Sequence, residues 1–443
     1  MVLSHQDMIT LFRNSAPYIN AHRGKTFVLM LSGEAIESPT LPTIIHDIAL
    51  LNTLGVRVVI VHGARPQIDE RIALRNIEGR FADNIRITDK TTLECVKDAA
   101  GSVRSQVEAL LTMGLANSPM HGAQIRVASG NLVVAKPMGV RGGVDYENTG
   151  SVRRIDTQGI NDHLNDGSIV LLSPIGYSPT GEVFNLSHEE IATQAAQALG
   201  ADKLIAFSEY KGIMERVSTP SGIELVLHRN IELARFEMLQ DHGNLVNEPS
   251  VIHALHDSVD KGIPRAHCVS YDIDGALIKE LFTRDGTGSL VMENHYEQLR
   301  PADINDVVGI LSLIKPLEES GALVKRSRER LENEIDQFTV IERDGMIIAC
   351  AALYAYPDDG LGEIACVATH GDYRGANRGE RVLEALLSQA AQQGLNSLFV
   401  LTTLTAHWFL EQGFVEGSIS DLPTQKQELY NFTRKSKVFT LAV

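Results

Sequence analysis

A short apolar segment that carries one carboxylate runs into a loop rich in arginine and glycine. The segment is Gly362-Glu363-Ile364-Ala365-Cys366-Val367-Ala368, and the loop is Arg374-Gly375-Ala376-Asn377-Arg378-Gly379. Directly after the loop an apolar repeat of helical spacing begins at Val382. A strand, a glycine-containing loop and a helix N-terminus present backbone N–H groups to an anion. The pattern predicts a pyrophosphate-binding loop, whereas glycines alone would indicate only a tight turn.

The elements around this loop are those of one small α+β domain. Strands over 338–341 and 347–353 flank Asp344-Gly345, a strong hairpin signal. The loop and its helix lead to a fourth strand over 395–403, followed by Trp408-Phe409-Leu410-Glu411-Gln412-Gly413-Phe414. We expect this domain to occupy residues 296–443.

Hairpin, strand, R-x-x-x-x-G loop, helix, strand and W-F-x-x-x-G-F together resemble the GNAT family of acyl-CoA-dependent N-acetyltransferases. In that family the loop takes the coenzyme A pyrophosphate, and the backbone of the preceding strand pairs with the pantetheine arm. The resemblance implies acetyl-CoA as co-substrate and no metal. The positions it assigns to acetyl-CoA are Ala365, Cys366, Val367, Arg374, Gly375, Ala376, Asn377, Arg378 and Gly379. Asn377 stands where glycine is usual, and asparagine tolerates a positive φ.

The first 291 residues alternate short β-branched runs with amphipathic stretches. Strands over 27–31 and 56–61 are joined by a helix over 42–54, with no hairpin turn between them. This order implies a crossover connection and a parallel sheet. A second unit of the same kind covers residues 168–207. The predicted fold is a three-layer α/β sandwich.

Three segments of this domain resemble the amino-acid kinase family, most closely acetylglutamate kinase: residues 61–66, 184–192 and 285–288. That family opens with a V-x-K-x-G-G pattern whose lysine meets ATP phosphate, and Met30 stands in its place. Ala64 and Arg65 replace the usual glycines, and Ser187-His188-Glu189 replaces an N-A-D segment. These changes indicate that the domain is not a working kinase.

An inactive amino-acid kinase domain ahead of a GNAT domain resembles the bacterial N-acetylglutamate synthases. The resemblance implies acetyl transfer from acetyl-CoA to the α-amine of L-glutamate, the first step of arginine biosynthesis, with feedback inhibition by L-arginine. It also implies a homo-oligomer, a hexamer, and a regulatory role for residues 1–291. Two alternatives remain open, a functional amino-acid kinase and a non-catalytic amino-acid sensor.

The chemistry of this reaction assigns roles to a few side chains. The attacking amine must lose a proton, and Glu363 is the candidate general base, the alternative being an exposed strand-edge carboxylate. The backbone N–H near Cys366 would polarise the thioester carbonyl, and a packed strand cysteine is favoured over a covalent nucleophile. Thr402 and Tyr430 are candidates for protonating the thiolate of coenzyme A. Thr402 is equally well explained as a strand residue satisfied by its neighbours.

The two carboxylates of glutamate call for bidentate cations. By resemblance these are Arg326 and Arg434, with Ser436 assisting, although each basic cluster is otherwise a solvated face. The resemblance places the arginine effector near Tyr18, His267, Glu280 and Gly286.

Composition narrows the range of partners. Acidic residues outnumber basic ones by 56 to 40, and the formal charge of −16 argues against a nucleic-acid partner. The longest apolar run, Ile347 to Tyr356, is too short to span a bilayer, and no signal-peptide pattern opens the chain. The 4 cysteines include no CxxC pair, so we expect buried thiols in a cytoplasmic protein.

Overall fold

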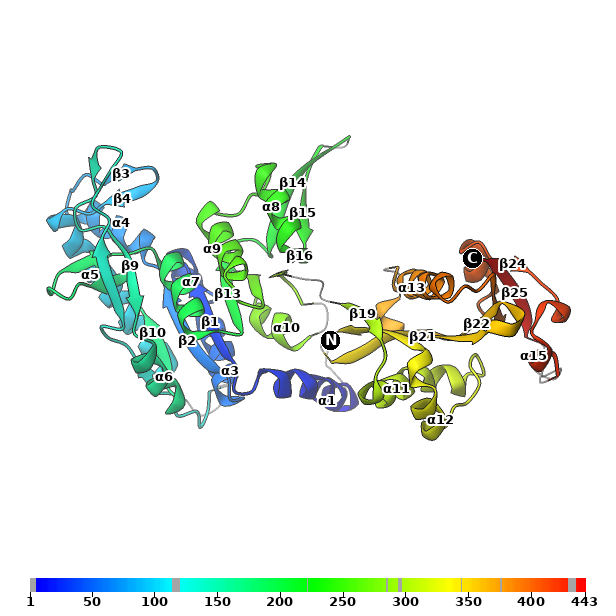
Figure 1. The fold of residues 1–443 in the computed structure, drawn as a ribbon. Helices are drawn as coiled ribbons and strands as arrows, with labels where there is room; N and C mark the ends of the chain where they lie inside the picture. Colours follow the sequence, from blue (N-terminus) through cyan, green and yellow to red (C-terminus); the bar gives the residue numbers. More distant parts are fainter. Residues whose placement is uncertain are drawn as a thin grey trace. The chain divides into compact units, whose positions relative to one another are not determined.

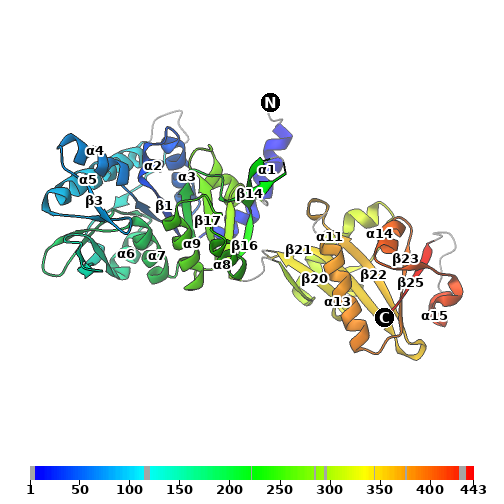
Figure 2. The same cartoon turned by 90° about the horizontal axis from the view of Figure 1, so that it is seen from above.

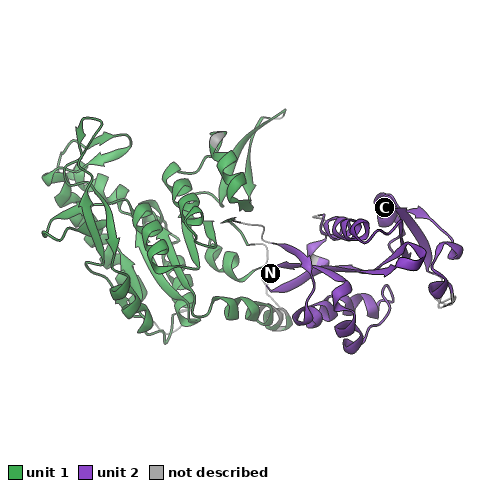
Figure 3. Ribbon diagram, viewed as in Figure 1, with its two compact units in different colours: residues 1–294 green, residues 295–443 purple. Residues whose placement is uncertain are grey.

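The computed structural model describes residues 5–113, 120–220, 222–283, 286–293, 297–343, 345–374, 377–428 and 436–443. The chain forms two compact units, unit 1 over residues 1–294 and unit 2 over residues 295–443 (Figure 3). All four cysteines are free and buried, as expected. Within the described residues, no helix combines the length and the apolar character that crossing a membrane requires.

Unit 1 is built on a mostly parallel sheet, which contains eight strands among the described residues. In spatial order these are β16 (Asn230–Glu232), β18 (Ser289–Met292), β17 (Ala266–Ser270), β13 (Lys203–Ser208), β1 (Thr26–Leu31), β2 (Arg57–His62), β10 (Ile169–Leu172) and β5 (Val127–Ala128). The predicted parallel pairing is confirmed, because β1 pairs in parallel with β2 on one side and β13 on the other. Every residue of β1 and β13 is buried, as expected of strands covered on both faces.

Helices cover both faces of this sheet (Figure 2). One face carries α1 (His5–His22), α2 (Gly33–Glu37), α3 (Leu41–Thr53), α4 (Arg65–Leu74), α5 (Lys90–Thr112) and α10 (Ala276–Phe282). The other carries α6 (Thr157–Asn165), α7 (His188–Leu199), α8 (Leu233–Asp241) and α9 (Pro249–Asp260). Apolar side chains that alternate along each strand feed two separate cores, so the three-layer sandwich is confirmed.

Smaller sheets extend unit 1. A four-stranded sheet in the described residues has the order β12 (Val183–Asn185), β11 (Ile175–Tyr177), β6 (Val133–Pro137) and β9 (Gly150–Ile155). The described part of unit 1 also forms three two-stranded pairs: β3 (Arg80–Ala82) with β4 (Ile85–Ile87), β7 (Val140–Arg141) with β8 (Val144–Asp145), and β14 (Ile213–Thr219) with β15 (Gly222–His228).

Unit 2 is a mostly antiparallel sheet of seven strands among the described residues. Their order is β19 (Gln298–Pro301), β20 (Phe338–Arg343), β21 (Met346–Tyr356), β22 (Leu361–Thr369), β23 (Ser397–Thr402), β25 (Lys437–Ala442) and β24 (Val415–Glu416). The predicted hairpin is confirmed as β20 and β21. β22 and β23 run parallel because a helix connects them.

Helices also cover both faces of the second sheet. In Figure 1, α13 (Arg378–Gln392) lies on one face, and α11 (Val307–Glu319) and α12 (Arg328–Asn333) lie on the other. Two short helices, α14 (Ala406–Glu411) and α15 (Thr424–Glu428), follow β23. The apolar side of α13, which the sequence pattern predicted, packs on β21 and β22 through Val382, Leu383 and Leu386.

Candidate active site

Two parallel strands of unit 2 separate partway along their length. β22 pairs with β23 from Leu361 to Ile364, opposite Ser397 to Val400. The register of the described residues contains no β23 partner for β22 beyond Ile364. Strand backbone beside such a divergence can pair with an extended ligand, since its N–H and C=O groups need partners. Ala365, Cys366 and Val367, which the family resemblance assigns to acetyl-CoA, lie at this point.

A β-bulge changes which face of the sheet the side chains of this part of β22 point to. The register with β21 shifts between Cys350 and Ala352, and Cys366 has a φ of 55°. Residues three apart in a regular strand point to opposite faces, and one extra residue reverses this. Ile364 packs under α13, whereas Cys366 packs with the core beneath α11 and α12. The bulge therefore puts Glu363 and Cys366 on the same face of the sheet, away from α13.

Glu363 is buried and paired. Its side chain is 10% exposed, and Lys426 Nζ in α15 lies 2.6 Å from its Oε2. The Tyr356 hydroxyl donates to the same oxygen at 3.4 Å. Burial and the Glu363 charge raise the pKa of Tyr356 above its ordinary value. Neither partner was identified from the sequence. Tyr356 is the last residue of β21, so the alternation of side chains along that strand indicates its face of the sheet. Lys426 lies 63 positions after Glu363 in the chain, so no local pattern indicates this contact.

Arg326 lies on this face too. Burial alone would lower the pKa of its guanidinium, but the electrostatic interactions with Cys366 and Tyr354 outweigh burial and raise this pKa. Its backbone N–H donates to Glu318, and its buried Nε has no hydrogen-bond partner among the described residues. Its Nη1 donates to the Val324 carbonyl at 3.3 Å, so Nε is the buried, charged donor that remains to suit a carboxylate ligand.

The remaining predicted residues of the acetyl-transfer site are of two kinds. Thr402 ends β23, and its hydroxyl bonds to Thr405 Oγ1 at 2.8 Å and accepts from the Thr405 N–H at 3.1 Å. This local turn accounts for the side chain without a catalytic role. Ser436 is buried directly before β25. Four predicted residues lie outside the described residues: Gly375, Ala376, Tyr430 and Arg434.

The loop before α13 ends in a left-handed residue. Asn377 has φ 52° and ψ 24°, as expected of asparagine in the place of glycine, and its side chain makes no capping bond. Among the described residues, the first N–H groups of this 15-residue helix therefore have no side-chain cap, which favours an anion there. A Cβ on Gly379 would lie 3.1 Å from the Trp408 ring, so glycine permits the close packing that joins the two sequence motifs.

The arginines of the loop behave differently. Arg374 is exposed. Arg378 donates from Nε and Nη2 to Glu297 at 2.9 and 2.5 Å, and from Nη1 to the Tyr373 carbonyl at 2.8 Å. The Arg378 guanidinium is thus committed within the protein, and its backbone N–H lies at the N-terminus of α13.

In unit 1 the structure brings three of the predicted effector residues together. Glu280 Oε1 lies 2.8 Å from His267 Nδ1, and Glu280 Oε2 accepts from the Thr287 and Gly288 N–H groups at 2.8 Å each. Burial, then the Lys203 charge, lowers the pKa of His267 to about 4, so its ring is neutral at pH 7. Gly286 has a φ of 58° and lies directly against the Glu280 carboxylate.

Burial alone would raise the pKa of Glu280, but the bonds from His267 and the loop outweigh it and lower the pKa. The ionised carboxylate therefore organises the loop that carries Gly286. Tyr18 lies in α1 and packs against the core beneath that face of the sheet.

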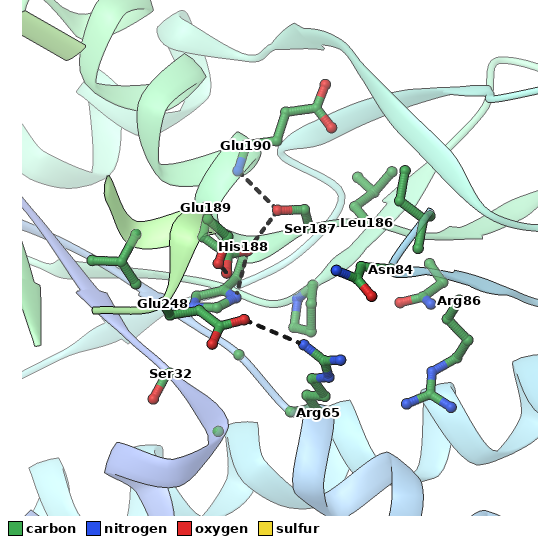
Figure 4. Close-up of a pocket in the computed structure, with 18 of the residues that line it drawn as sticks. Ser32, Arg65, Asn84, Arg86, Leu186, Ser187, His188, Glu189, Glu190 and Glu248 are labelled. Atoms are coloured by element: carbon green, nitrogen blue, oxygen red, sulfur yellow. Dashed lines mark hydrogen bonds and ion pairs between the residues drawn. The ribbon is translucent and has the colours of Figure 1, made fainter. Parts of the chain in front are cut away.

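A cavity of about 910 Å³ opens in unit 1 at the carboxyl ends of β1, β2, β13 and β17. Its described lining includes six carboxylates, Glu34, Asp83, Glu189, Glu190, Glu209 and Glu248, against two guanidinium groups, Arg65 and Arg86. Arg65 faces Glu248 at 3.7 Å (Figure 4). Arg86 bonds Asp69 at 2.5 Å. The lining is unfavourable for a nucleotide triphosphate.

The residues that replace the kinase motif form part of this wall. His188 Nδ1 lies 3.0 Å from Glu189, whose carboxylate also accepts from Ser187 and Ser250. Met30 is 1% exposed within the apolar core and supplies no charge. Strand β1 therefore provides no lysine to bind ATP phosphate, as the sequence predicted.

Comparisons with known proteins match both units. The model of the amino acid kinase family matches residues 25–262, and that of the acetyltransferase (GNAT) family matches residues 305–414. The chain is 51% identical to an amino-acid acetyltransferase of Pseudomonas fluorescens, over 99% of this chain and 100% of the relative. It is 51% identical to one from Aliivibrio fischeri, over 97% of each chain.

Two solved structures are similar over nearly the whole length. One is the N-acetylglutamate synthase of Neisseria gonorrhoeae complexed with coenzyme A and L-arginine, with 33% identity and a TM-score of 0.87. The other is the same enzyme complexed with coenzyme A and N-acetyl-glutamate, with 34% identity and a TM-score of 0.60. Each comparison covers 98% of this chain and 99% of the other.

Proposed function

The chain belongs to the amino-acid acetyltransferases, and we propose both the reaction that it catalyses and the regulation of that reaction. In this chain the amino acid kinase region precedes the GNAT region. The enzyme transfers the acetyl group of acetyl-CoA to the α-amine of L-glutamate, which begins arginine biosynthesis, and L-arginine inhibits it. No metal takes part in this reaction.

The observation that carries the proposal is the separation of β22 and β23 ahead of the α13 N-terminus. The pantetheine arm pairs with the backbone at Ala365 to Val367, and the pyrophosphate meets the first N–H groups of α13. By resemblance Gly375, Ala376, Asn377 and Gly379 also belong to the acetyl-CoA site, and the exposed Arg374 adds positive charge beside it.

Glu363 removes the proton from the glutamate ammonium group. The free amine then forms a bond to the thioester carbon, and the carbon–sulfur bond breaks. In the unliganded chain Lys426 neutralises Glu363 at 2.6 Å, so a substrate carboxylate competes with the base for this lysine. Transfer of a proton to Glu363 removes its negative charge and weakens the pair.

The Cys366 N–H, turned by the bulge, stabilises the oxyanion that develops on the acetyl group. The departing thiolate then takes a proton. Tyr430 and Thr402 are the candidates from sequence. Tyr356 joins them, because its hydroxyl lies 3.4 Å from the proposed base and keeps its proton at neutral pH.

Arg326 binds one carboxylate of glutamate, supported by its buried, unpartnered Nε beside Cys366. Arg434 and Ser436 bind the other, an assignment that rests on the family pattern alone. Two cations on a substrate with two carboxylates explain a preference for glutamate over neutral amino acids.

Arginine acts on unit 1, near Tyr18, His267, Glu280 and Gly286. The cluster already holds an ionised carboxylate against a glycine loop, which suits a guanidinium ligand. The chain works in the cytoplasm as a homo-oligomer, a hexamer. Exposed apolar side chains on α1 support a contact with another copy: Met8, Ile9 and Phe12 are 56%, 45% and 74% exposed.

An amino-acid kinase and a non-catalytic sensor are the alternatives. The acidic cavity and the buried Met30 disfavour the first. The turn at Asn377 and the buried Glu363–Lys426 pair disfavour a non-catalytic sensor, because amino-acid sensing requires neither a coenzyme A loop nor a buried base.

The test is release of free coenzyme A from acetyl-CoA with each amino acid as sole acceptor, with ATP turnover measured alongside. Release with L-glutamate, without ATP or metal, supports the proposal. Glutamate-dependent ATP hydrolysis without acetyl transfer would refute it.

A further inference from the structure

One buried carboxylate in unit 2 lies among three guanidinium groups of the described residues. The Glu297 side chain is 12% exposed. Its Oε1 lies 2.5 Å from Arg378 Nη2 and 3.9 Å from Arg343 Nη1, and its Oε2 lies 3.0 Å from Arg381 Nη1. Arg343 and Arg378 are 8% and 14% exposed. Buried charges of this kind persist only when they are paired, so the carboxylate is needed to hold the cluster.

The cluster is connected to the pyrophosphate loop at both of its ends. Arg378 is the first residue of α13, and its Nη1 donates to the Tyr373 carbonyl at the start of the loop. The guanidinium groups of Arg343 and Arg378 lie 5.2 and 5.1 Å from the centroid of the Tyr373 ring. A single side chain, Arg378, therefore bridges the two ends of the loop, and Glu297 fixes the orientation of that bridge through two hydrogen bonds.

Two kinds of donor meet at the start of α13, the Arg378 guanidinium and the backbone N–H groups of the first turn. The Arg378 donors are already used, so the arginine orients the backbone rather than grasping phosphate. The backbone N–H groups of α13 stay available for direct contact.

We propose that Glu297 is a positioning residue for acetyl-CoA, which holds Arg378 so that the first backbone N–H groups of α13 are oriented for the pyrophosphate. The inference rests on the proposed acetyl-CoA site. Glu297 contacts neither substrate, and its effect reaches the ligand through Arg378 and the Tyr373 carbonyl. Preorganisation of this kind acts on affinity, because donors that are already oriented lose less entropy on binding.

The test is the Kd of coenzyme A, measured by calorimetry on the full chain, for the parent and for Glu297→Gln. Gln keeps the shape of the side chain and removes its charge. We expect the Kd to rise by roughly 10- to 100-fold, the range for misplaced binding groups. The KM for L-glutamate should stay within about twofold, because Arg326 and Glu363 lie on other elements.

The matched control is Glu342→Gln in β20. Glu342 also accepts two hydrogen bonds from an arginine, Arg300, at 2.9 and 3.2 Å. Neither residue of this pair belongs to the loop or to α13. The Kd of Glu342→Gln for coenzyme A should match that of the parent. Melting temperatures of both variants report any general loss of structure.

Arg378→Met and the double variant Glu297→Gln/Arg378→Met complete a double-mutant cycle for the Glu297–Arg378 contact. If Glu297 acts through Arg378, either substitution removes the same effect and the double variant binds coenzyme A no more weakly than Arg378→Met. Additive losses, an unchanged Kd in Glu297→Gln, or equal weakening of glutamate would each overturn the proposal. A parent chain that binds no coenzyme A would instead refute the proposed function.

Discussion

Replacement of Arg326 by methionine tests how the enzyme recognises its amino-acid substrate. The guanidinium lies beside Cys366 with a buried, unpartnered Nε, at the bulge where the acetyl group is proposed to react. Methionine preserves the apolar stem and removes the charge. We expect a higher KM for L-glutamate and an unchanged Kd for coenzyme A, because the substitution leaves the β22 backbone and α13 in place.

The size of the effect follows from burial. Loss of one partner of a buried, hydrogen-bonded charge pair costs roughly 2–5 kcal/mol. Arg326 is half-buried, so the lower part of this range applies, about 2–3 kcal/mol. At 1.4 kcal/mol for each factor of ten, kcat/KM for glutamate should fall by roughly 30- to 150-fold.

The assay is initial-rate kinetics with each substrate varied in turn. Arg328→Met is the control, since Arg328 lies two residues away, is 69% exposed, and pairs with Glu332 on the surface of α12. It should behave as the parent, because exposed ion pairs contribute little. If Arg326→Met weakened coenzyme A and left glutamate unaffected, Arg326 would belong to the coenzyme and our assignment would be wrong.

Four further outcomes are expected. Glu363→Gln should lower kcat by roughly two to four orders of magnitude with coenzyme A binding intact, and a rate within a few-fold of the parent would make Glu363 a strand residue only. Lys426→Met should lower kcat/KM for glutamate by roughly tenfold, whereas Lys437→Met, which breaks the exposed pair with Glu416, should not. Glu280→Gln should remove the response to an arginine titration and spare the uninhibited rate, and persistent inhibition would move the effector site elsewhere. Burial and the Asp274 carboxylate raise the pKa of Asp47 from 3.8 to about 7, so stability should fall as pH rises from about 4 to 7, and Asp47→Asn should flatten that slope in thermal melts.

The layered fold was predictable because it depends on local patterns. Apolar runs such as 27–31 and 203–207 have the length and β-branched content of buried strands, and helical spacing between them leaves few alternatives to parallel pairing. The left-handed turn at Asn377 was predictable for the same reason, since it depends on one residue's steric tolerance.

The polar partners in unit 2 were not predictable. Lys426 and Glu363 are 63 positions apart, and Glu297 and Arg378 are 81 apart, so nothing local in the sequence indicates either pair. The bulge at Cys366 was not predictable either, because an extra strand residue is recognised only when the register with the neighbouring strand is known. Thr402 illustrates the converse, because its hydroxyl bonds to Thr405, only three positions along the chain, and the sequence had already left this local explanation open.

The central claim is that unit 2 acetylates glutamate and that unit 1 has no kinase chemistry. The most direct measurement is mass spectrometry of the products formed from L-glutamate and acetyl-CoA, with ATP and metal omitted and the Glu363→Gln variant run in parallel. We predict N-acetyl-glutamate and free coenzyme A in equal amounts from the parent, with strongly reduced amounts from the variant. Product formation that requires ATP, or a parent chain that leaves both reactants intact, would contradict the claim.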